Sequence, residues 1–385
     1  MNILVADISG KVPLYNESLC LSLGEQTEGK HRFFCATPSL QTNLETVRQI
    51  KLLNLLPEKY KKSKSRIKRI VKAIEGLLNY IYLLYIIKQN KIDILHLQWL
   101  PFLEFTGIEL YILKLIRKIY PDVRIILTIH NVYPHNYPEL KKNYYKERFI
   151  AISELIAFFI VHTKETASEV INEYCLDPNQ IGVVHHGLFV PKGFISSKQM
   201  PQNTQIRFIM FGSQEPYKGT DLLVEAAVKL PKDSQERMFI TIVGEIQKDY
   251  YLHLSKQTEG LNVKWIPRFV EEKELYSEIA HSDVIVLPYR TISQSGALML
   301  ALSFNKPIIA SDLPSFKETL NGFSDDLFFE TDNSDSLAAL MKRYIDGTID
   351  FNKTLSIIVD LRQQYSWHLA AQKTVLIYDS LIKTQ

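Results

Sequence analysis

Cysteine is scarce in this sequence, and long uninterrupted apolar runs are missing. The 385 residues include three cysteines, Cys20, Cys35 and Cys175, whose spacing matches neither a disulfide framework nor a metal site. We therefore expect a reducing compartment. The longest apolar run, 76–87, contains Asn79 and is too short to span a bilayer as a helix. The first residues lack the basic stretch and apolar run of a signal peptide, which favours a cytoplasmic protein.

Charge and motif content exclude further classes of protein. A net charge of +3 does not by itself indicate a nucleic-acid partner, and we expect none. No G-x-G-x-x-G occurs, which counts against an ordinary dinucleotide-binding dehydrogenase. No D-x-D follows a strand, so we predict neither a metal ion nor a cofactor. With 46% hydrophobic residues the chain can bury a core, and its length favours two domains.

Short β-branched or aliphatic runs alternate with amphipathic stretches, a pattern typical of parallel βαβ units. The first half is predicted to form strands at 3–7, 92–97, 124–129, 157–162 and 180–185, with a helix at 104–120. The second half is predicted to form strands at 206–211, 238–243, 263–266, 284–287 and 307–310. The expected fold is α/β, with two Rossmann-like, doubly wound parallel-sheet domains that face each other across a cleft.

A polar stretch that contains Pro and Gly separates the two halves. It predicts an N-terminal domain over 1–190, a linker over 191–205 and a C-terminal domain over 206–364. In the remaining segment, 365–385, apolar residues recur on one helical face. We expect this segment to form a helix that crosses back to the N-terminal domain.

Two loops of the second half are suited to bind an anion. In the first, a strand ends at Gly212 and Ser213, and Lys218 with Gly219 precedes a helix. Glycine permits close backbone approach, a helix N-terminus favours anions, and a lysine placed there can reach a phosphate. The alternative is an ordinary βα loop with a surface lysine.

The second loop follows the strand at 284–287. Ser295 and Gly296 stand where a helix should begin, so their amides and the hydroxyl are suited to hold a diphosphate. A plain helix cap is the alternative. Two anion-suited loops in one half of the chain are more informative than either loop alone.

In the first half, polar and aromatic side chains follow predicted strands. His96 and Trp99 end one strand, and His130 and Asn131 follow the next. Because ligands bind beyond the carboxyl ends of strands in open α/β sheets, we expect His130 to point at the cleft as the foremost candidate of this half, with His96, Trp99 and Asn131 on the acceptor side. A packing or capping role is the alternative for each histidine. Gly10 follows the first strand in a loop of its own.

Together these segments resemble the retaining GT-B glycosyltransferases of family four. The resemblance implies that Lys218 binds the donor diphosphate, that the Gly10 loop approaches the donor, and that His130 touches the donor sugar as the catalytic-site histidine. It also implies that the loop at Phe269 and Val270 reads the nucleotide base. The sequence departs from the family where Ser213 replaces an arginine.

Another departure concerns two glutamates, whose positions fall near Ile292 and Leu300. The sequence instead resembles a sub-group with Pro-Tyr-Arg at 288–290 and Gln-Ser-Gly at 294–296. Gln294, Ser295 and Gly296 are therefore expected at the donor, and Arg290 is expected to replace the missing arginine as a phosphate partner.

Eight basic residues lie between Lys59 and Lys72, interrupted and followed by apolar ones. Such a segment suits an anionic membrane surface. A solvated helix face is the alternative. We therefore expect a cytoplasmic protein that binds at the inner face of the membrane through 59–72.

The resemblance implies a hexosyltransferase-type enzyme that moves a sugar from a nucleotide-diphosphate sugar to a glycan or lipid-linked acceptor in polysaccharide or glycolipid assembly, with retention and without a metal. Three alternatives stay open. The chain could be a non-catalytic sugar-nucleotide-binding homologue or partner subunit, a GT-B sugar-nucleotide epimerase, or an adaptor that uses the basic segment to bind a partner.

Overall fold

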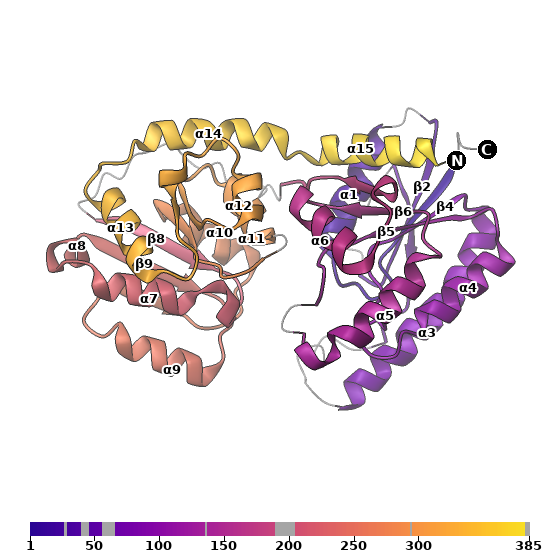
Figure 1. The fold of residues 1–385 in the computed structure, drawn as a ribbon, viewed down its shortest axis with the longest axis horizontal. Coiled ribbons are helices and arrows are strands. Elements are labelled where there is room, and N and C mark those ends of the chain that lie inside the picture. Colours follow the sequence, from indigo (N-terminus) through magenta and orange to yellow (C-terminus); the bar gives the residue numbers. More distant parts are fainter. Residues whose placement is uncertain are drawn as a thin grey trace. The chain divides into compact units, whose positions relative to one another are not determined.

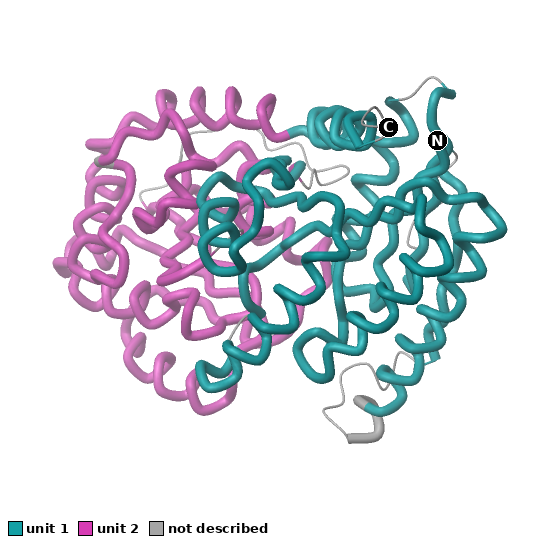
Figure 2. Tube along the Cα trace, turned by 45° about the vertical axis from the view of Figure 1, so that its right-hand side comes forward, with its two compact units in different colours: residues 1–187, 366–385 teal, residues 188–365 magenta. Residues whose placement is uncertain are grey.

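The computed structural model describes residues 1–26, 29–39, 46–55, 66–134, 137–188, 205–292 and 295–381, without the side chains of 66–69 and 326. The chain divides into two compact units (Figure 2). The first unit contains Met1–Gly187 and Ser366–Gln385, and the second contains Leu188–Tyr365. The end of the sequence thus belongs to the same unit as its beginning.

The first unit is built on a seven-stranded parallel sheet in the order β3-β2-β1-β4-β5-β6-β7. Its strands are β1 (Asn2–Ala6), β2 (Arg32–Thr37), β3 (Arg48–Lys51), β4 (Ile94–Leu97), β5 (Arg124–Thr128), β6 (Phe158–Val161) and β7 (Ile181–Val183). Because all strands are parallel, their carboxyl ends lie along one edge of the sheet. The residues that follow β1, β4, β5 and β6 are thereby brought to that edge.

Helices cover both faces of this sheet (Figure 1). They are α1 (Pro13–Gln26), α3 (Arg66–Asn90), α4 (Glu109–Ile119), α5 (Lys142–Ser153), α6 (Lys164–Tyr174) and α15 (Trp367–Ser380), with short 3-10 turns at Glu139–Lys141 and Pro178–Gln180. Alternate residues of β1 enter different cores: Leu4 packs with α3 to α6, whereas Ile3 and Val5 pack with α1 and α15. The apolar runs of the strands are explained by burial on both faces.

The second unit has a six-stranded parallel sheet in the order β10-β9-β8-β11-β12-β13. Its strands are β8 (Ile206–Phe211), β9 (Met238–Val243), β10 (Val263–Ile266), β11 (Val284–Leu287), β12 (Ile308–Ser311) and β13 (Phe328–Phe329). Its helices are α7 (Thr220–Lys229), α8 (Lys232–Glu236), α9 (Lys248–Gln257), α10 (Glu272–Ala280), α11 (Gly296–Ser303), α12 (Pro314–Thr319), α13 (Ser334–Ile345) and α14 (Phe351–Gln364), with 3-10 turns η3 (Pro216–Lys218) and η4 (Asp325–Leu327). The strand order reverses next to β8, between β8 and β11, which is where open α/β sheets bind ligands.

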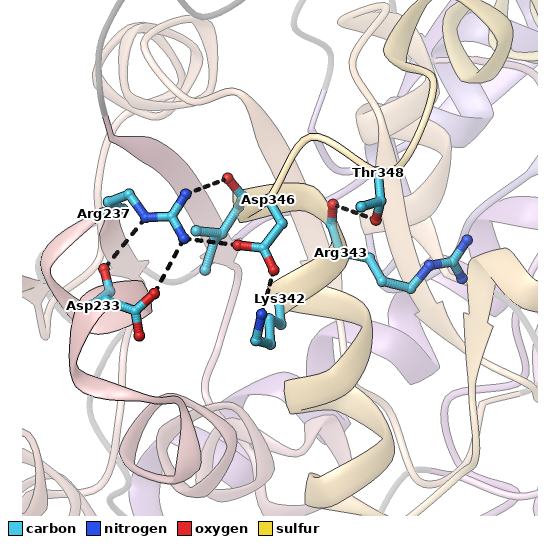
Figure 3. Close-up of polar contacts among 7 residues, drawn as sticks. Asp233, Arg237, Lys342, Arg343, Asp346 and Thr348 are labelled. Carbon is cyan, nitrogen blue, oxygen red and sulfur yellow. Dashed lines mark hydrogen bonds and ion pairs between the residues drawn. The ribbon is translucent and has the colours of Figure 1, made fainter.

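An ion-pair cluster on the second unit ties the segment before β9 to the end of α13 (Figure 3). The Arg237 guanidinium donates to Asp346 at 2.7 Å and to the Ile345 carbonyl at 3.2 Å, and Lys342 also contacts Asp346. The cation therefore complements the negative end of the α13 dipole. Because these side chains are partly exposed, the cluster holds the end of α13 in place but adds little to the free energy of unfolding.

The two parallel-sheet units confirm the α/β fold expected from the sequence. Three strands were not predicted: β2, β3 and β13. The predicted helix at 104–120 begins later, at Glu109, whose carboxylate accepts from the Phe102 amide and so orders the preceding turns. Most of the predicted linker, 191–204, lies outside the described residues.

Helix α3 corrects the expectation drawn from 76–87. The segment Ile70–Asn90, 21 residues long, is long and apolar enough to cross a membrane by length and composition. A core helix of a soluble protein passes the same test, and α3 buries Tyr80 and Leu83 in the core of the first unit. The buried Asn79 side chain is also hydrogen-bonded within that unit. The helix is accordingly a packed element of the first unit.

Gly219 provides a stability test of the second unit. It has φ +72°, and a Cβ added there would lie 1.9 Å from the Pro288 carbonyl oxygen. Gly347 has a similar φ, +69°, with open space around its Cβ position. We expect Gly219→Ala to lower the free energy of unfolding by several kcal/mol, whereas Gly347→Ala carries only the left-handed penalty of about 1–2 kcal/mol. Urea unfolding measures both, and equal losses would contradict the backbone clash.

Candidate functional site

In the second unit, Gln214 fixes the loop between β8 and α7. Its side-chain amide donates to the Gly212 carbonyl at 2.7 Å and to the Val243 carbonyl at 3.0 Å. Its carbonyl oxygen accepts from the Thr220 hydroxyl at 2.8 Å. One buried side chain thus joins the end of β8, the end of β9 and the start of α7. The sequence analysis did not single out Gln214.

Lys218 ends the 3-10 turn that follows this loop, and it is a buried cation. Only 9% of the residue is exposed. Its Nζ lies 3.5 Å from the Ser213 hydroxyl and 5.7 Å from the ring centroid of Tyr289. No carboxylate of the described residues lies within 4 Å of it. Burial therefore lowers the pKa of Lys218 to about 8, against the weaker opposing effect of Glu215.

The turn of Lys218 lies directly against the end of β11. The Arg290 amide donates to the Tyr217 carbonyl at 2.7 Å, and the rings of Tyr217 and Tyr289 meet edge to face. Gly219 approaches the Pro288 carbonyl so closely that no Cβ fits between them. The structure thus brings together the two loops that the sequence analysis identified separately.

Ser295 begins helix α11 as its N-cap. Its Oγ accepts from the Leu298 amide at 3.1 Å, so the hydroxyl serves the helix itself. Gly296 has open space at its Cβ position, which leaves room beside the first turn. Gln294, also expected at the donor, lies outside the described residues.

The environment of Arg290 shows a structural use of this side chain, while its expected role as a replacement phosphate ligand stays a prediction. Its guanidinium makes two hydrogen bonds to Asp221, at 2.8 and 2.9 Å, one to Asp332 at 2.5 Å and one to the Pro216 carbonyl at 2.8 Å. These carboxylates raise the pKa of Arg290 above its ordinary value. Most N–H donors of Arg290 are thus bonded to Asp221, Asp332 and the Pro216 carbonyl. Because Pro216 belongs to the turn that carries Lys218, Arg290 holds that turn in place.

Phe269 and Val270 follow β10 at the same edge of the sheet. Phe269 is exposed, and Val270 packs partly against the core beneath α10 and α11. Arg268 beside them pairs with Glu274 on α10 at 2.6 Å. The structure therefore places this loop at the carboxyl edge, along with the loops after β8 and β11.

In the first unit, Trp99, His130 and Asn131 line one small pocket beyond β4 and β5. The Gly10 loop reaches the same region, because Lys11 lies 5.5 Å over the Trp99 ring. Glu104 also lines this pocket and is the one carboxylate among its described lining residues. Partial burial raises the pKa of Glu104. The sequence analysis did not identify it.

The Gly10 loop is shaped by Asp7, a residue that the sequence analysis also missed. The Asp7 carboxylate accepts from the Lys11 amide at 3.1 Å and from the Val12 amide at 2.9 Å, just before α1. Gly10 itself has φ +66°. Asp7 therefore occupies the anion-binding position at the start of α1 with a carboxylate of the chain itself.

His130 belongs to a group of rings in mutual contact, of which His162 and His186 are buried. Its Nδ1 lies 3.2 Å from Nε2 of His162, and the Tyr15 ring contacts His130, His162 and His186 edge to face. Burial lowers the pKa of His162 to about 4 and that of His186 to about 3, and it holds the pKa of His130 well below its ordinary value. The strands β5, β6 and β7 lie side by side, and this pairing assembles the group.

His96 does not lie where the acceptor-side expectation put it. The side chain is fully buried, its Nδ1 lies 2.6 Å from the Tyr378 hydroxyl, and its Nε2 lies 2.7 Å from the Thr128 hydroxyl. Burial lowers the pKa of His96 to about 3. Both nitrogens are thus used inside the first unit, where His96 anchors α15 to the sheet.

Among the described residues, no group of three or more His, Cys, Asp or Glu side chains is arranged to hold a metal ion. The three cysteines are all free thiols, two of them buried.

Comparisons with known proteins identify the family of both halves of the chain. Residues 28–188 match the family model described as Glycosyltransferase Family 4, and residues 192–356 match the model described as Glycosyl transferases group 1. The chain is similar to the GDP-mannose:glycolipid 4-beta-D-mannosyltransferase of Xanthomonas campestris pv. campestris, with 25% identity over 237 residues. That alignment covers 57% of this chain and 62% of the relative, which is less than two thirds of its length.

Solved structures share the whole fold. The glycosyltransferase from Rickettsia africae ESF-5 superposes with a TM-score of 0.68 at 18% identity, covering 100% of this chain and 99% of the other. Anabaena Alr3699/HepE, solved in complex with UDP-glucose, superposes with a TM-score of 0.66 at 14% identity, covering 99% and 100%. The chain therefore belongs to the GT-B glycosyltransferases related to family four, as the resemblance in the sequence indicated.

The Lys218 ammonium, which has no carboxylate partner among the described residues, gives a test that separates folding from ligand binding. Its lowered pKa means that burial of the charge opposes folding, so we expect Lys218→Met to raise the unfolding free energy by about 1–3 kcal/mol at neutral pH. The gain should shrink as pH rises from about 8 towards the ordinary lysine value, because the wild-type amine then folds without its charge.

Lys229→Met is the matched control, because its amine is half-exposed and pairs with Asp335 at 2.8 Å. We expect this change to leave stability nearly unaltered. Thermal unfolding across the pH range measures both variants. A destabilised Lys218→Met variant would contradict an uncompensated buried charge.

Proposed function

We propose that this protein transfers a hexosyl group from a nucleoside-diphosphate sugar to a glycan or lipid-linked acceptor. The single observation that supports this most is Lys218, a buried cation without a carboxylate partner among the described residues. A desolvated ammonium gains most from an anion that arrives with the ligand, and a diphosphate supplies that charge.

The second unit is proposed to hold the donor. When the bond between the anomeric carbon and the diphosphate oxygen breaks, negative charge grows on the leaving group. Lys218, the backbone around Gly212 and the first turn of α11 would stabilise that charge. Basic side chains and helix ends suffice for this in principle, so we propose a metal-independent reaction. Retention of configuration is proposed from the resemblance to family four.

The first unit is proposed to receive the sugar and the acceptor. Its pocket combines the Trp99 ring, the His130 imidazole and the Glu104 carboxylate. An aromatic ring stacks on apolar sugar faces, while the polar groups meet hydroxyls. A lipid-linked acceptor is favoured by the glycolipid acceptor in the printed name of the Xanthomonas relative.

Membrane attachment is proposed to involve the outer face of α3. This helix exposes a stripe of large apolar side chains at intervals of three and four residues: Ile70, Ile74, Leu77, Leu78, Ile81, Tyr82 and Tyr85. The basic segment 59–72 overlaps its start. An apolar stripe beside clustered basic charge suits the interface of an anionic bilayer.

The described part of that basic segment is small. Lys59, Lys61, Lys62 and Lys64 lie outside the described residues, and the side chains of Arg66, Lys68 and Arg69 are not described. Lys72 pairs with the buried Glu75 at 2.6 Å, so its charge is partly used within the first unit. The proposal therefore rests on the apolar stripe, with the basic sequence as its electrostatic complement.

A transfer assay decides between the proposed function and its alternatives. We expect one member of a panel of UDP- and GDP-sugars to raise the melting temperature and to donate its sugar to a lipid-linked acceptor, with release of the free nucleoside diphosphate. Lys218→Met should lower kcat/KM about 100-fold or more. Chromatography and mass spectrometry identify the products.

The other outcomes of the assay each point to a different protein. Donor binding without transfer would indicate a non-catalytic homologue or partner subunit. Interconversion of free nucleotide sugars without an acceptor would indicate an epimerase. Absence of any nucleotide binding would favour an adaptor.

Vesicle binding tests the membrane proposal. We expect the protein to co-sediment with vesicles that contain an anionic lipid more than with zwitterionic vesicles. Ile81→Glu combined with Tyr85→Glu should reduce that binding about tenfold or more, because each buried apolar side chain contributes roughly 1.5–3 kcal/mol. Leu252→Glu is the control, because Leu252 is similarly exposed (52%) on α9 of the second unit. Equal losses in both variants would overturn the proposal for α3.

A further inference from the structure

A chain of hydrogen bonds ends at His130, and its direction can be followed from one fixed point. Nδ1 of His162 lies 2.9 Å from the backbone carbonyl of Val184. A carbonyl oxygen only accepts, so the hydrogen of this bond belongs to Nδ1 of His162. The second nitrogen of His162, Nε2, then carries a hydrogen only if the ring is charged.

The surroundings keep His162 neutral. The residue is 2% exposed, and it faces the Tyr15 ring and the imidazoles of His130 and His186, with His185 also nearby. No carboxylate of the described residues pairs with it. Burial lowers the pKa of His162 to about 4. Its Nε2 is therefore a lone-pair acceptor at neutral pH.

The unprotonated Nε2 of His162 determines which nitrogen of His130 carries a hydrogen. Nδ1 of His130 lies 3.2 Å from Nε2 of His162, and two lone pairs at that distance would repel. Nδ1 of His130 must therefore carry the hydrogen and donate it. Because His130 is also kept neutral, its Nε2 is left without a hydrogen.

The unprotonated Nε2 of His130 has no hydrogen-bond partner among the described residues, although the atom is buried. His130 lines the pocket that also contains Trp99 and Asn131. A buried lone pair without a partner is unfavourable in a native structure, and a ligand that donates a hydrogen bond would relieve it.

We propose that His162 is a positioning residue that fixes His130 as the Nδ1-protonated tautomer, so that Nε2 of His130 accepts a hydrogen bond from a sugar hydroxyl in this pocket. The inference rests on the proposed function for the nature of the ligand. It excludes a phosphate oxygen as the partner of Nε2, because phosphate oxygens have no hydrogen to donate.

The tautomer can be measured without any activity. In the full-length protein labelled with 15N at histidine, the ring-nitrogen shifts of His130 distinguish a protonated Nδ1 from a protonated Nε2 at neutral pH. We expect Nδ1 to be protonated in the wild type. A wild-type spectrum with the hydrogen on Nε2 would overturn the inference directly.

Two variants of His162 then test the cause. His162→Gln keeps an acceptor oxygen on a side chain of similar reach, and His162→Leu removes the acceptor. We expect the glutamine variant to keep the Nδ1-protonated state and the leucine variant to show a mixture of tautomers. An unchanged His130 spectrum in a folded leucine variant would show that His162 does not set the tautomer.

Kinetics on the transferred sugar supply the functional arm. We expect His162→Leu to lower kcat/KM about tenfold, the factor that accompanies loss of one hydrogen bond, and His162→Gln to recover most of it. A donor whose sugar lacks the hydroxyl bonded to His130 should lower the kcat/KM of the wild type by the same factor. With that donor, the wild type and His162→Leu should be equally active. Equal activity in all three proteins would overturn the positioning role. A wild type that transfers no sugar would instead refute the proposed function, while the NMR spectra would still decide the tautomer.

Discussion

The close approach of Gly219 to the Pro288 carbonyl is the constraint on which the second unit's site depends. It holds the turn after β8 against the end of β11, where the strand order of the sheet reverses. Arg290, which pairs with Asp221 and Asp332 and donates to the Pro216 carbonyl, also holds this junction. Lys218 is thereby held in a buried position that no surface lysine would adopt by itself. Asp221 and Asp332 pair with Arg290, so neither of these carboxylates pairs with Lys218.

The first unit solves a different physical problem, which is to bury several imidazoles without charging them. Neutral histidines in contact must alternate donor and acceptor along the chain of rings, and one backbone carbonyl is enough to set the direction. Val184 supplies that carbonyl to His162. The tautomer of His130 therefore depends on the pairing of β6 with β7, because this pairing brings His162 and Val184 together.

Much of the fold could be predicted from the sequence, because strands buried on both faces appear as continuous apolar runs. Strands β8 to β11 match the predicted bounds for this reason. Strand β3, Arg48–Lys51, is a short edge strand in which Ile50 is the one apolar residue, so it leaves no apolar run in the sequence. Loop chemistry indicated Lys218 and His130, but the partners of Arg290 lie 69 and 42 residues away in the sequence. Local patterns carry no information on such distant pairing, and the same limit hid Tyr15 and His162.

The two units differ in the charge of their buried polar groups. In the second unit the Lys218 cation is buried without a carboxylate partner among the described residues, so an anionic ligand would stabilise it. In the first unit burial keeps every histidine of the group neutral, so hydroxyl groups meet lone pairs and not charges. A nucleoside-diphosphate sugar has the matching division, with its charge on the diphosphate and its hydroxyls on the sugar. Each unit therefore favours a different kind of group: the second unit a negatively charged group, and the first unit a hydroxyl that donates a hydrogen bond.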